Sequence, residues 1–330
     1  MDAPVHVAPV PPREPTTDVT PRFRARIFRF DPATDATPRF DAVEVPCEPH
    51  MRVLDVLDHA VEECGLSIGY RYFCGIKRCG MCGVNVNGKA VLACWEAATP
   101  DMVIEPLGNM PVIRDLIVDR SAFEQATVDL EPRLVRKTPY TSFPEVYTHR
   151  DVAATFPLMN CIECYVCSST CPAVPGPHPG AHGREGQRGF VGPGTLVQIA
   201  KVALHPKDEL DRSGMLENAS IDHCMSCYRC EQVCPVGIPI VSHAIMPLRG
   251  LAAKGPAGKA RFPLDFADNV RTHVDIHSGS LFVKAKGWVR ALASVPLVLR
   301  MLMRGKTRLF SRPSARAKRE VNALFKAAGS

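Results

Sequence analysis

Residues 74–94 read CGIKRCGMCGVNVNGKAVLAC, and the spacing of their cysteines determines how the first half of the chain must fold. The four cysteines are Cys74, Cys79, Cys82 and Cys94, in the pattern C-x4-C-x2-C-x11-C. This spacing is typical of a plant-type 2Fe–2S ligand set. Adjacent glycines let backbone N–H groups turn toward the sulfurs at φ values that other residues resist. Zinc or buried free thiols are the alternatives, although a zinc ribbon favours two separated C-x2-C pairs.

The flanking residues predict a small domain of strands with one helix. Apolar and charged residues alternate after Phe23, as in a half-buried strand. Apolar residues recur over 40–45, where a returning strand would complete a β-hairpin. Apolar residues between Val53 and Cys64 lie on one helical stripe, so Cys64 is expected to be a buried free thiol and Gly65 to cap the helix. Asn87-Gly88 predicts a second hairpin, whose far strand brings Cys94 to the site.

Two further cysteine runs lie in the second half, where strand signals end and helices are predicted. Residues 161–172 read CIECYVCSSTCP and residues 224–235 read CMSCYRCEQVCP, two complete C-x2-C-x2-C-x3-C-P motifs. In such a motif three cysteines surround one cubic cluster and the fourth binds the other cluster. The predicted first cubic site is Cys161, Cys164, Cys167 and Cys234; the predicted second is Cys171, Cys224, Cys227 and Cys230.

Composition favours reduced thiols over disulfides. The chain has 14 cysteines in 330 residues, and its N-terminus shows no basic start followed by an apolar run. We therefore expect a cytoplasmic protein, in which thiols stay reduced and serve as metal ligands. Because the apolar stretches fall short of the roughly 18 residues of a membrane span, we also expect no transmembrane segment.

Charge is concentrated at the C-terminal end. Residues 281–330 contain 12 lysines and arginines but one acidic residue, a charge of +11, whereas the other 280 residues carry 28 basic and 33 acidic residues, a charge of −5. This basic tail could lie on an anionic membrane surface, dock on an acidic partner or be a solvated helix. Nucleic acid is not expected as a partner, because aromatic residues for base stacking are scarce.

The whole sequence therefore predicts an α+β fold in two domains. The expected segments are a disordered Pro-rich N-terminus (1–21), a 2Fe–2S domain (22–130), a linker (131–150), an α-helical domain with two cubic clusters (151–255) and a basic helical extension (256–330). We predict no catalytic residues, because neither a Ser/His/Asp set nor a pair of carboxylates stands out. Substrate chemistry is expected on a partner.

Beyond these motifs, the sequence from Phe23 to Leu251 resembles the iron–sulfur subunit of succinate dehydrogenase and fumarate reductase. Besides the cysteine runs, the similarity includes MRVLDVLDHA (51–60), IEPLGNMPVIRDLIVD (104–119) and FVGPGTLVQIA (190–200). The resemblance implies a β-grasp ferredoxin domain, an α-helical ferredoxin domain, one 2Fe–2S cluster and two cubic clusters. It also implies an FAD-containing flavoprotein that acts on a dicarboxylate, and a quinone at a membrane anchor on the cytoplasmic side of the inner membrane.

The sequence departs from that family at the second cubic site. Much of the family has no cysteine at the position of Cys227 and carries a 3Fe–4S cluster there. Cys227 predicts a 4Fe–4S cluster instead, with 3Fe–4S as the alternative. The stretch 173–176 lacks the family's Trp, and Met225 replaces its frequent histidine, so we expect a differently built quinone site.

The tail sequence LVLRMLMRGKTRLF (297–310) departs from the family as well. It resembles the ends of dicluster subunits in heterodisulfide-reductase-like and glycolate-oxidase-like complexes. The alternative function is therefore electron transfer for another flavoprotein, such as a 2-hydroxyacid oxidase. A third possibility, a module whose metals only hold the fold, would be distinguished by its lack of visible colour if the metal were zinc.

Overall fold

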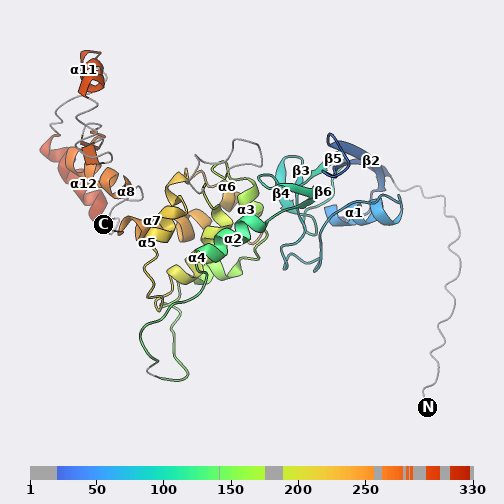
Figure 1. The fold of residues 1–330 in the computed structure, drawn as a ribbon, viewed down its shortest axis with the longest axis horizontal. Coiled ribbons are helices and arrows are strands. Elements are labelled where there is room, and N and C mark those ends of the chain that lie inside the picture. The colour runs from blue at the N-terminus through green and yellow to red at the C-terminus, as the bar shows by residue number, and fades with distance from the viewer. Residues whose placement is uncertain are drawn as a thin grey trace.

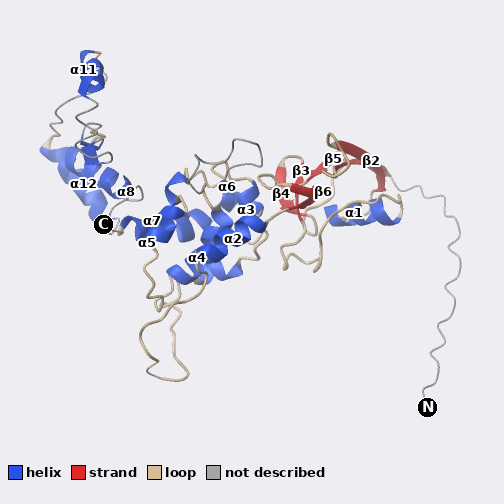
Figure 2. Cartoon of the chain, in the orientation of Figure 1, coloured by secondary structure: helices blue, strands red, loops and turns tan. Residues whose placement is uncertain are grey.

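A computed structural model shows a sheet-containing first part followed by a helical second part, which confirms the predicted α+β fold (Figures 1 and 2). It describes residues 21–140, 142–174, 189–255, 262–277, 280–281, 283–284, 295–304 and 313–327. Apart from residue 21, the predicted Pro-rich N-terminus lies outside the described residues.

The first part is a mixed sheet with the strand order β2-β1-β5-β3-β4. Its strands are β1 (Arg22–Arg29), β2 (Arg39–Pro46), β3 (Gly83–Val86), β4 (Lys89–Leu92) and β5 (Met102–Glu105). Both predicted hairpins are confirmed, since β1 pairs with β2 and β3 pairs with β4 in antiparallel register. The parallel pairing of β1 with β5 completes the β-grasp arrangement.

Helix α1 (Val53–Glu62) packs its apolar stripe, including Val53, Val56 and Leu57, into the core of this sheet. It ends as predicted, because Gly65 adopts a φ of 69° and the Leu66 N–H donates to the Ala60 carbonyl at 3.0 Å. The prediction that Cys64 is buried is wrong, since Cys64 is exposed. The helical stripe stops at Glu62, so the turn beyond it carries Cys64 away from the core.

The helical part is built around α4 (Pro193–Ala203), whose first eight residues are all buried. The other elements up to residue 255 are α2 (Ser121–Asp129), η1 (Phe156–Asn160), α3 (Val166–Ser169), α5 (Ser213–Asn218), η2 (Ile221–His223), α6 (Arg229–Gln232), η3 (Val241–Ile245) and α7 (Met246–Ala253). Helix α2 packs on α4 although it precedes the 131–150 segment in sequence. The short hairpin of β6 (Val112–Arg114) and β7 (Ile117–Val118) leads into α2.

The predicted linker over 131–150 contains no helix or strand among its described residues, and side chains of the helical part bind its backbone. Arg212, only 3% exposed, donates to the carbonyls of Leu130, Glu131 and Arg133. Asp208 forms an ion pair with the same guanidinium at 2.7 Å. These bonds attach the segment to the helical part along its first residues.

The C-terminal extension contains α8 (Phe262–His273), α11 (Val295–Met303) and α12 (Ala315–Ala327). Helices α8 and α12 lie side by side, and the Arg271 guanidinium lies 5.8 Å from the Phe325 ring centre (Figure 1). In the described part of the chain, no helix is both long enough and apolar enough to cross a membrane.

Candidate iron–sulfur sites

The β3–β4 hairpin positions one half of the predicted 2Fe–2S site. Cys82 directly precedes β3 and Cys94 follows β4, so antiparallel pairing brings the two thiols together. The Ala93 N–H donates to the Cys82 carbonyl at 2.9 Å and extends this pairing toward the site. Both cysteines are buried, and burial raises the pKa of the Cys82 thiol to about 12. A buried thiol of this kind loses its proton when it binds a metal.

The loop that follows α1 provides the other half, with Cys74 and Cys79. Three backbone N–H groups donate to the Cys74 sulfur, from Ile76 at 3.5 Å, Arg78 at 3.2 Å and Cys79 at 3.3 Å. These donors lower the pKa of the Cys74 thiol to about 7, because they stabilise negative charge on sulfur. The backbone of this loop therefore stabilises Cys74 as a thiolate, which is the form that binds iron.

The predicted first cubic site surrounds a cavity in the helical part. Its four cysteines, Cys161, Cys164, Cys167 and Cys234, all line this cavity. The rest of the lining is largely apolar, with Val197 and Ile240 among its members. Burial raises the pKa of the Cys167 thiol well above its usual range, and the neighbouring cysteines raise it further. Gln198 Nε2 donates to Cys161 Sγ at 3.2 Å and adds a polar contact to one sulfur.

The predicted second cubic site surrounds a separate cavity. Cys171, Cys224, Cys227 and Cys230 line it, together with apolar residues that include Phe190 and Val241. The fourth cysteine of each run thus lies with the first three of the other run, as the spacing predicted. Cys227 is exposed, whereas Cys230 is buried and burial raises the pKa of its thiol to about 12.

The donor sets fit iron–sulfur clusters. A cubic cluster needs several thiolates around one space, because different thiolates bind different irons. Cavities lined by four thiols and apolar groups match that requirement. Cluster ligation by the individual cysteines stays a prediction.

Comparison with known proteins gives two family matches. Residues 24–125 match a 2Fe-2S iron-sulfur cluster binding domain, and residues 157–238 match a 4Fe-4S dicluster domain. The fumarate reductase iron-sulfur subunit of Mycobacterium tuberculosis is 30% identical over 233 residues, which cover 67% of this chain and 89% of that protein. The chain belongs to the family of succinate dehydrogenase and fumarate reductase iron–sulfur subunits. It therefore carries one 2Fe–2S cluster and two cubic clusters.

Other family resemblances differ in the share of each protein that they cover. One subunit of the fumarate reductase (CoM/CoB) of Methanothermobacter marburgensis is 30% identical over 277 residues, 82% of this chain and 52% of that protein. The chain thus spans about half the length of that relative, and 39–40% of two other archaeal iron-sulfur proteins. A chain of the Mycobacterium smegmatis Sdh1 complex in the apo form has the same fold, with a TM-score of 0.64, 24% identity and coverage of 72% of this chain and 100% of that chain.

In this iron–sulfur subunit the three cysteine groups follow one another through the molecule. Gly80, in the 2Fe–2S loop, lies so close to the first cubic run that an added Cβ would meet the Ile162 carbonyl oxygen at 2.3 Å. On the other side, α3, which contains Cys167, contacts α6, which contains Cys230. The first cubic site therefore lies between the other two sites.

Sequence reasoning missed residues that hold the cysteine runs in place. Asn109 Nδ2 donates to the Ser168 carbonyl at 3.1 Å and the Cys171 carbonyl at 2.9 Å, which joins the loop after β5 to the first run. The Gly194 N–H donates to Ser168 Oγ at 3.2 Å. Both residues lie in family-like stretches, but only the three-dimensional contacts reveal what they support.

Proposed function

We propose that the chain is the electron-transfer subunit of a succinate dehydrogenase or fumarate reductase-type complex. It would relay electrons between an FAD-containing flavoprotein and a quinone or membrane partner. The observation that carries the proposal is the spatial order of the three cysteine groups, in which the first cubic site lies between the other two sites. We place the chemistry of succinate or fumarate on the flavoprotein, so that this chain acts as the relay.

The surface around the 2Fe–2S loop fits the flavoprotein side of the relay. Large apolar side chains are exposed on both flanks of Cys74: Phe73 is 83% exposed and Ile76 is 65% exposed. Trp95, beside Cys94, is 52% exposed, and Lys77 Nζ lies 4.7 Å from its ring centre. Clustered exposed aromatic groups are typical of protein interfaces.

The second cubic site fits the opposite end of the relay. Exposed Cys227 is accompanied by Met225, which is 64% exposed, and Tyr228, which is 42% exposed. An electron acceptor can therefore approach this site from outside the chain. We assign the second cluster as 4Fe–4S, because Cys227 lines the cavity with the other three ligands. A fourth thiolate adds negative charge and lowers the reduction potential, which favours a low-potential acceptor.

The C-terminal extension fits a membrane surface or membrane anchor subunit, on the cytoplasmic side of the inner membrane. Helix α11 exposes Val295, Leu299 and Met303, and α12 exposes Leu324. Between Asp275 and Glu320 the sequence has no acidic residue. Apolar side chains interspersed with lysine and arginine favour anionic interfaces.

Anaerobic purification with metal analysis tests the relay. We expect a brown protein with about ten iron atoms, two, four and four. Mixing it with its reduced flavoprotein should bleach the visible cluster absorbance. Zinc in place of iron would contradict the proposal, and so would clusters that accept no electrons from the flavoprotein.

A second candidate is the same relay in the service of another flavoprotein. The tail stretch 297–310 favours it, because this stretch resembles the ends of dicluster subunits in heterodisulfide-reductase-like and glycolate-oxidase-like complexes. The Methanothermobacter marburgensis relative is itself named a fumarate reductase (CoM/CoB) and supports the first candidate. Identifying the flavoprotein that co-purifies would separate the candidates. Activity with succinate or fumarate supports the first, and activity with a 2-hydroxyacid or a disulfide supports the second.

A further inference from the structure

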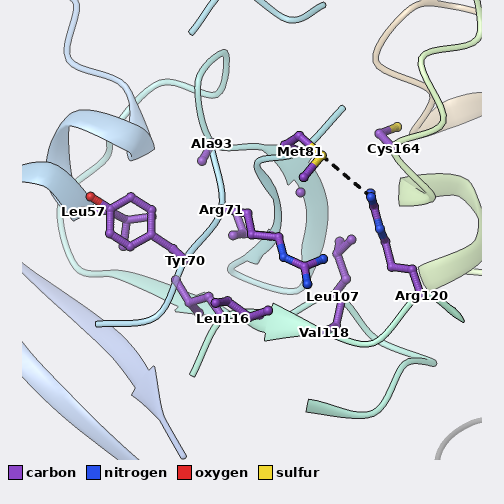
Figure 3. A pocket seen from close by; sticks show the side chains of 13 residues that line it. Leu57, Tyr70, Arg71, Met81, Ala93, Leu107, Leu116, Val118, Arg120 and Cys164 are labelled. Carbon is purple, nitrogen blue, oxygen red and sulfur yellow. Dashed lines mark hydrogen bonds between the residues drawn. The ribbon is translucent and has the colours of Figure 1, made fainter. Parts of the chain in front are cut away.

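Arg120 lies at the junction between the two parts of the molecule. It follows the β6–β7 hairpin and immediately precedes α2. Its side chain is only 15% exposed and helps to line a cavity to which the β-grasp part contributes Met81 and the helical part contributes Cys164. Figure 3 shows the guanidinium extending into this junction toward Met81, with Cys164 on the other side. Both predicted ligand loops therefore border the same cation.

The contacts of Arg120 reach both loops. Its Nη2 lies 3.7 Å from Met81 Sδ, and Met81 lies between two predicted ligands of the 2Fe–2S cluster. Its Cζ lies 5.4 Å from the ring centre of Tyr165, which directly follows Cys164. A methionine sulfur is a weak acceptor and an aromatic ring carries no net charge, so neither contact neutralises the guanidinium.

Among the described residues, the positive charge of Arg120 forms an ion pair with an exposed carboxylate and is otherwise held by uncharged groups. Its Nε is buried and has no hydrogen-bond partner. The acidic group paired with it is Glu124, at 3.8 Å, and that side chain is 57% exposed. Arg71 lines the same cavity and also acts on Asp119, whose pKa is lowered mainly by its hydrogen bonds with Ser121 and to a smaller extent by the charge of Arg71. Solvent screens a mostly buried charge less than an exposed one, so Arg120 acts over a longer range than a surface arginine.

We propose that Arg120 is an electrostatic bridge between the 2Fe–2S cluster and the first cubic cluster, and that it raises the reduction potentials of both. Reduction adds one electron to a cluster, and a nearby positive charge stabilises the more negative product. This inference rests on the proposed function, because it requires clusters on both cysteine groups. Arg120 acts here as a positioning and tuning residue, since it ligates neither cluster.

Potentiometric titration of the full chain, with dithionite as reductant and electron paramagnetic resonance as readout, tests the proposal. Arg120→Met removes the charge, and Arg120→Lys retains it. Arg133→Met is the matched control, because its side chain is 71% exposed. We expect Arg120→Met to shift both reduction equilibria by about tenfold, which is about 59 mV to lower potential for a one-electron couple. Arg120→Lys and Arg133→Met should both stay close to the parent.

Several results would overturn the proposal. Midpoints in Arg120→Met equal to those of the parent would do so. An equal shift in Arg133→Met would show a general surface-charge effect, and an equal shift in Arg120→Lys would show that packing is responsible. If Arg120→Met loses iron, Arg120→Gln is titrated under the same criteria. A parent chain without iron would contradict the proposed function itself, whereas full clusters with unchanged midpoints would contradict this inference alone.

Discussion

The two cubic-cluster runs have nearly the same backbone but very different surroundings. In the first run Glu163 and Tyr165 have φ values of 54° and 58°, and in the second run Ser226 and Tyr228 have 53° and 62°. A short helix follows each pair, and each run begins with a cysteine in extended conformation. The repeated motif therefore produces the same loop twice.

What covers each loop differs. Tyr165 is 5% exposed, with Phe123 at 5.5 Å between ring centres and Arg120 over its ring. Tyr228, its counterpart, is 42% exposed. Local sequence thus builds the ligand loop, and the packing of the β-grasp part and α2 makes one loop an inner relay and leaves the other accessible.

The largest expected difference comes from removing the paired tyrosines. Tyr165→Ala should destabilise the protein by about 3 kcal/mol, because it leaves a cavity in a packed junction. Tyr228→Ala should cost below about 1 kcal/mol, because the ring is partly solvated. Because the two tyrosines have similar φ values, the effect of each substitution on the local backbone should be the same and should cancel in the comparison. Guanidinium unfolding under argon, followed by cluster absorbance, measures the difference, and equal losses would mean that the runs are equally packed.

Adding a methyl group at Gly80 tests the contact that makes the first run internal. Gly80→Ala places a Cβ 2.3 Å from the Ile162 carbonyl oxygen, so the two parts must separate. Gly88→Ala is the control, since Gly88 also has a positive φ but nothing within 4 Å of its Cβ position. We expect Gly80→Ala to cost about 2 kcal/mol more than the control. It should also slow reduction of the cubic clusters by the 2Fe–2S cluster, as measured by freeze-quench spectroscopy.

Removing predicted ligands at equivalent positions of the two runs tests the comparison spectroscopically. Cys227→Ala should leave a 3Fe–4S signal and change stability by less than about 1 kcal/mol, because position 227 is exposed. Added iron and a small thiol should restore a 4Fe–4S spectrum, since the thiol can reach the vacant iron position. Cys164→Ala should resist this rescue, because Cys164 is 8% exposed. Rescue of both variants, or a parent that already shows a strong 3Fe–4S signal, would contradict this difference.

Truncation of the basic tail at Leu281 is expected to have the smallest effect on the clusters of the two cysteine runs. The removed segment includes α11 and α12, and the described contacts of α12 are chiefly with α8. Cluster spectra and midpoints should stay unchanged, whereas the complex should move from the membrane to the supernatant fraction. Unchanged membrane association would favour a merely solvated helix, and altered midpoints at the second cubic site would show that the tail covers that run.

The sequence alone determined the fold class, both hairpins, α1 and the grouping of the cysteines. These features depend on short-range rules: strand alternation, the Asn87-Gly88 turn and fixed cysteine spacing act over a few residues. The exchange of Cys171 and Cys234 between runs was also predictable, because the last turn of each motif points away from its own cluster.

Only the tertiary structure decided which parts of these local structures are covered. The helical stripe predicted a buried Cys64, but α1 ends before it and the thiol is exposed. Two equivalent tyrosines differ in exposure because α2, although it precedes the 131–150 segment, packs on the helical part. The same packing encloses the Arg120 guanidinium between two ligand loops. Burial depends on contacts between residues far apart in the chain, and local patterns do not contain that information.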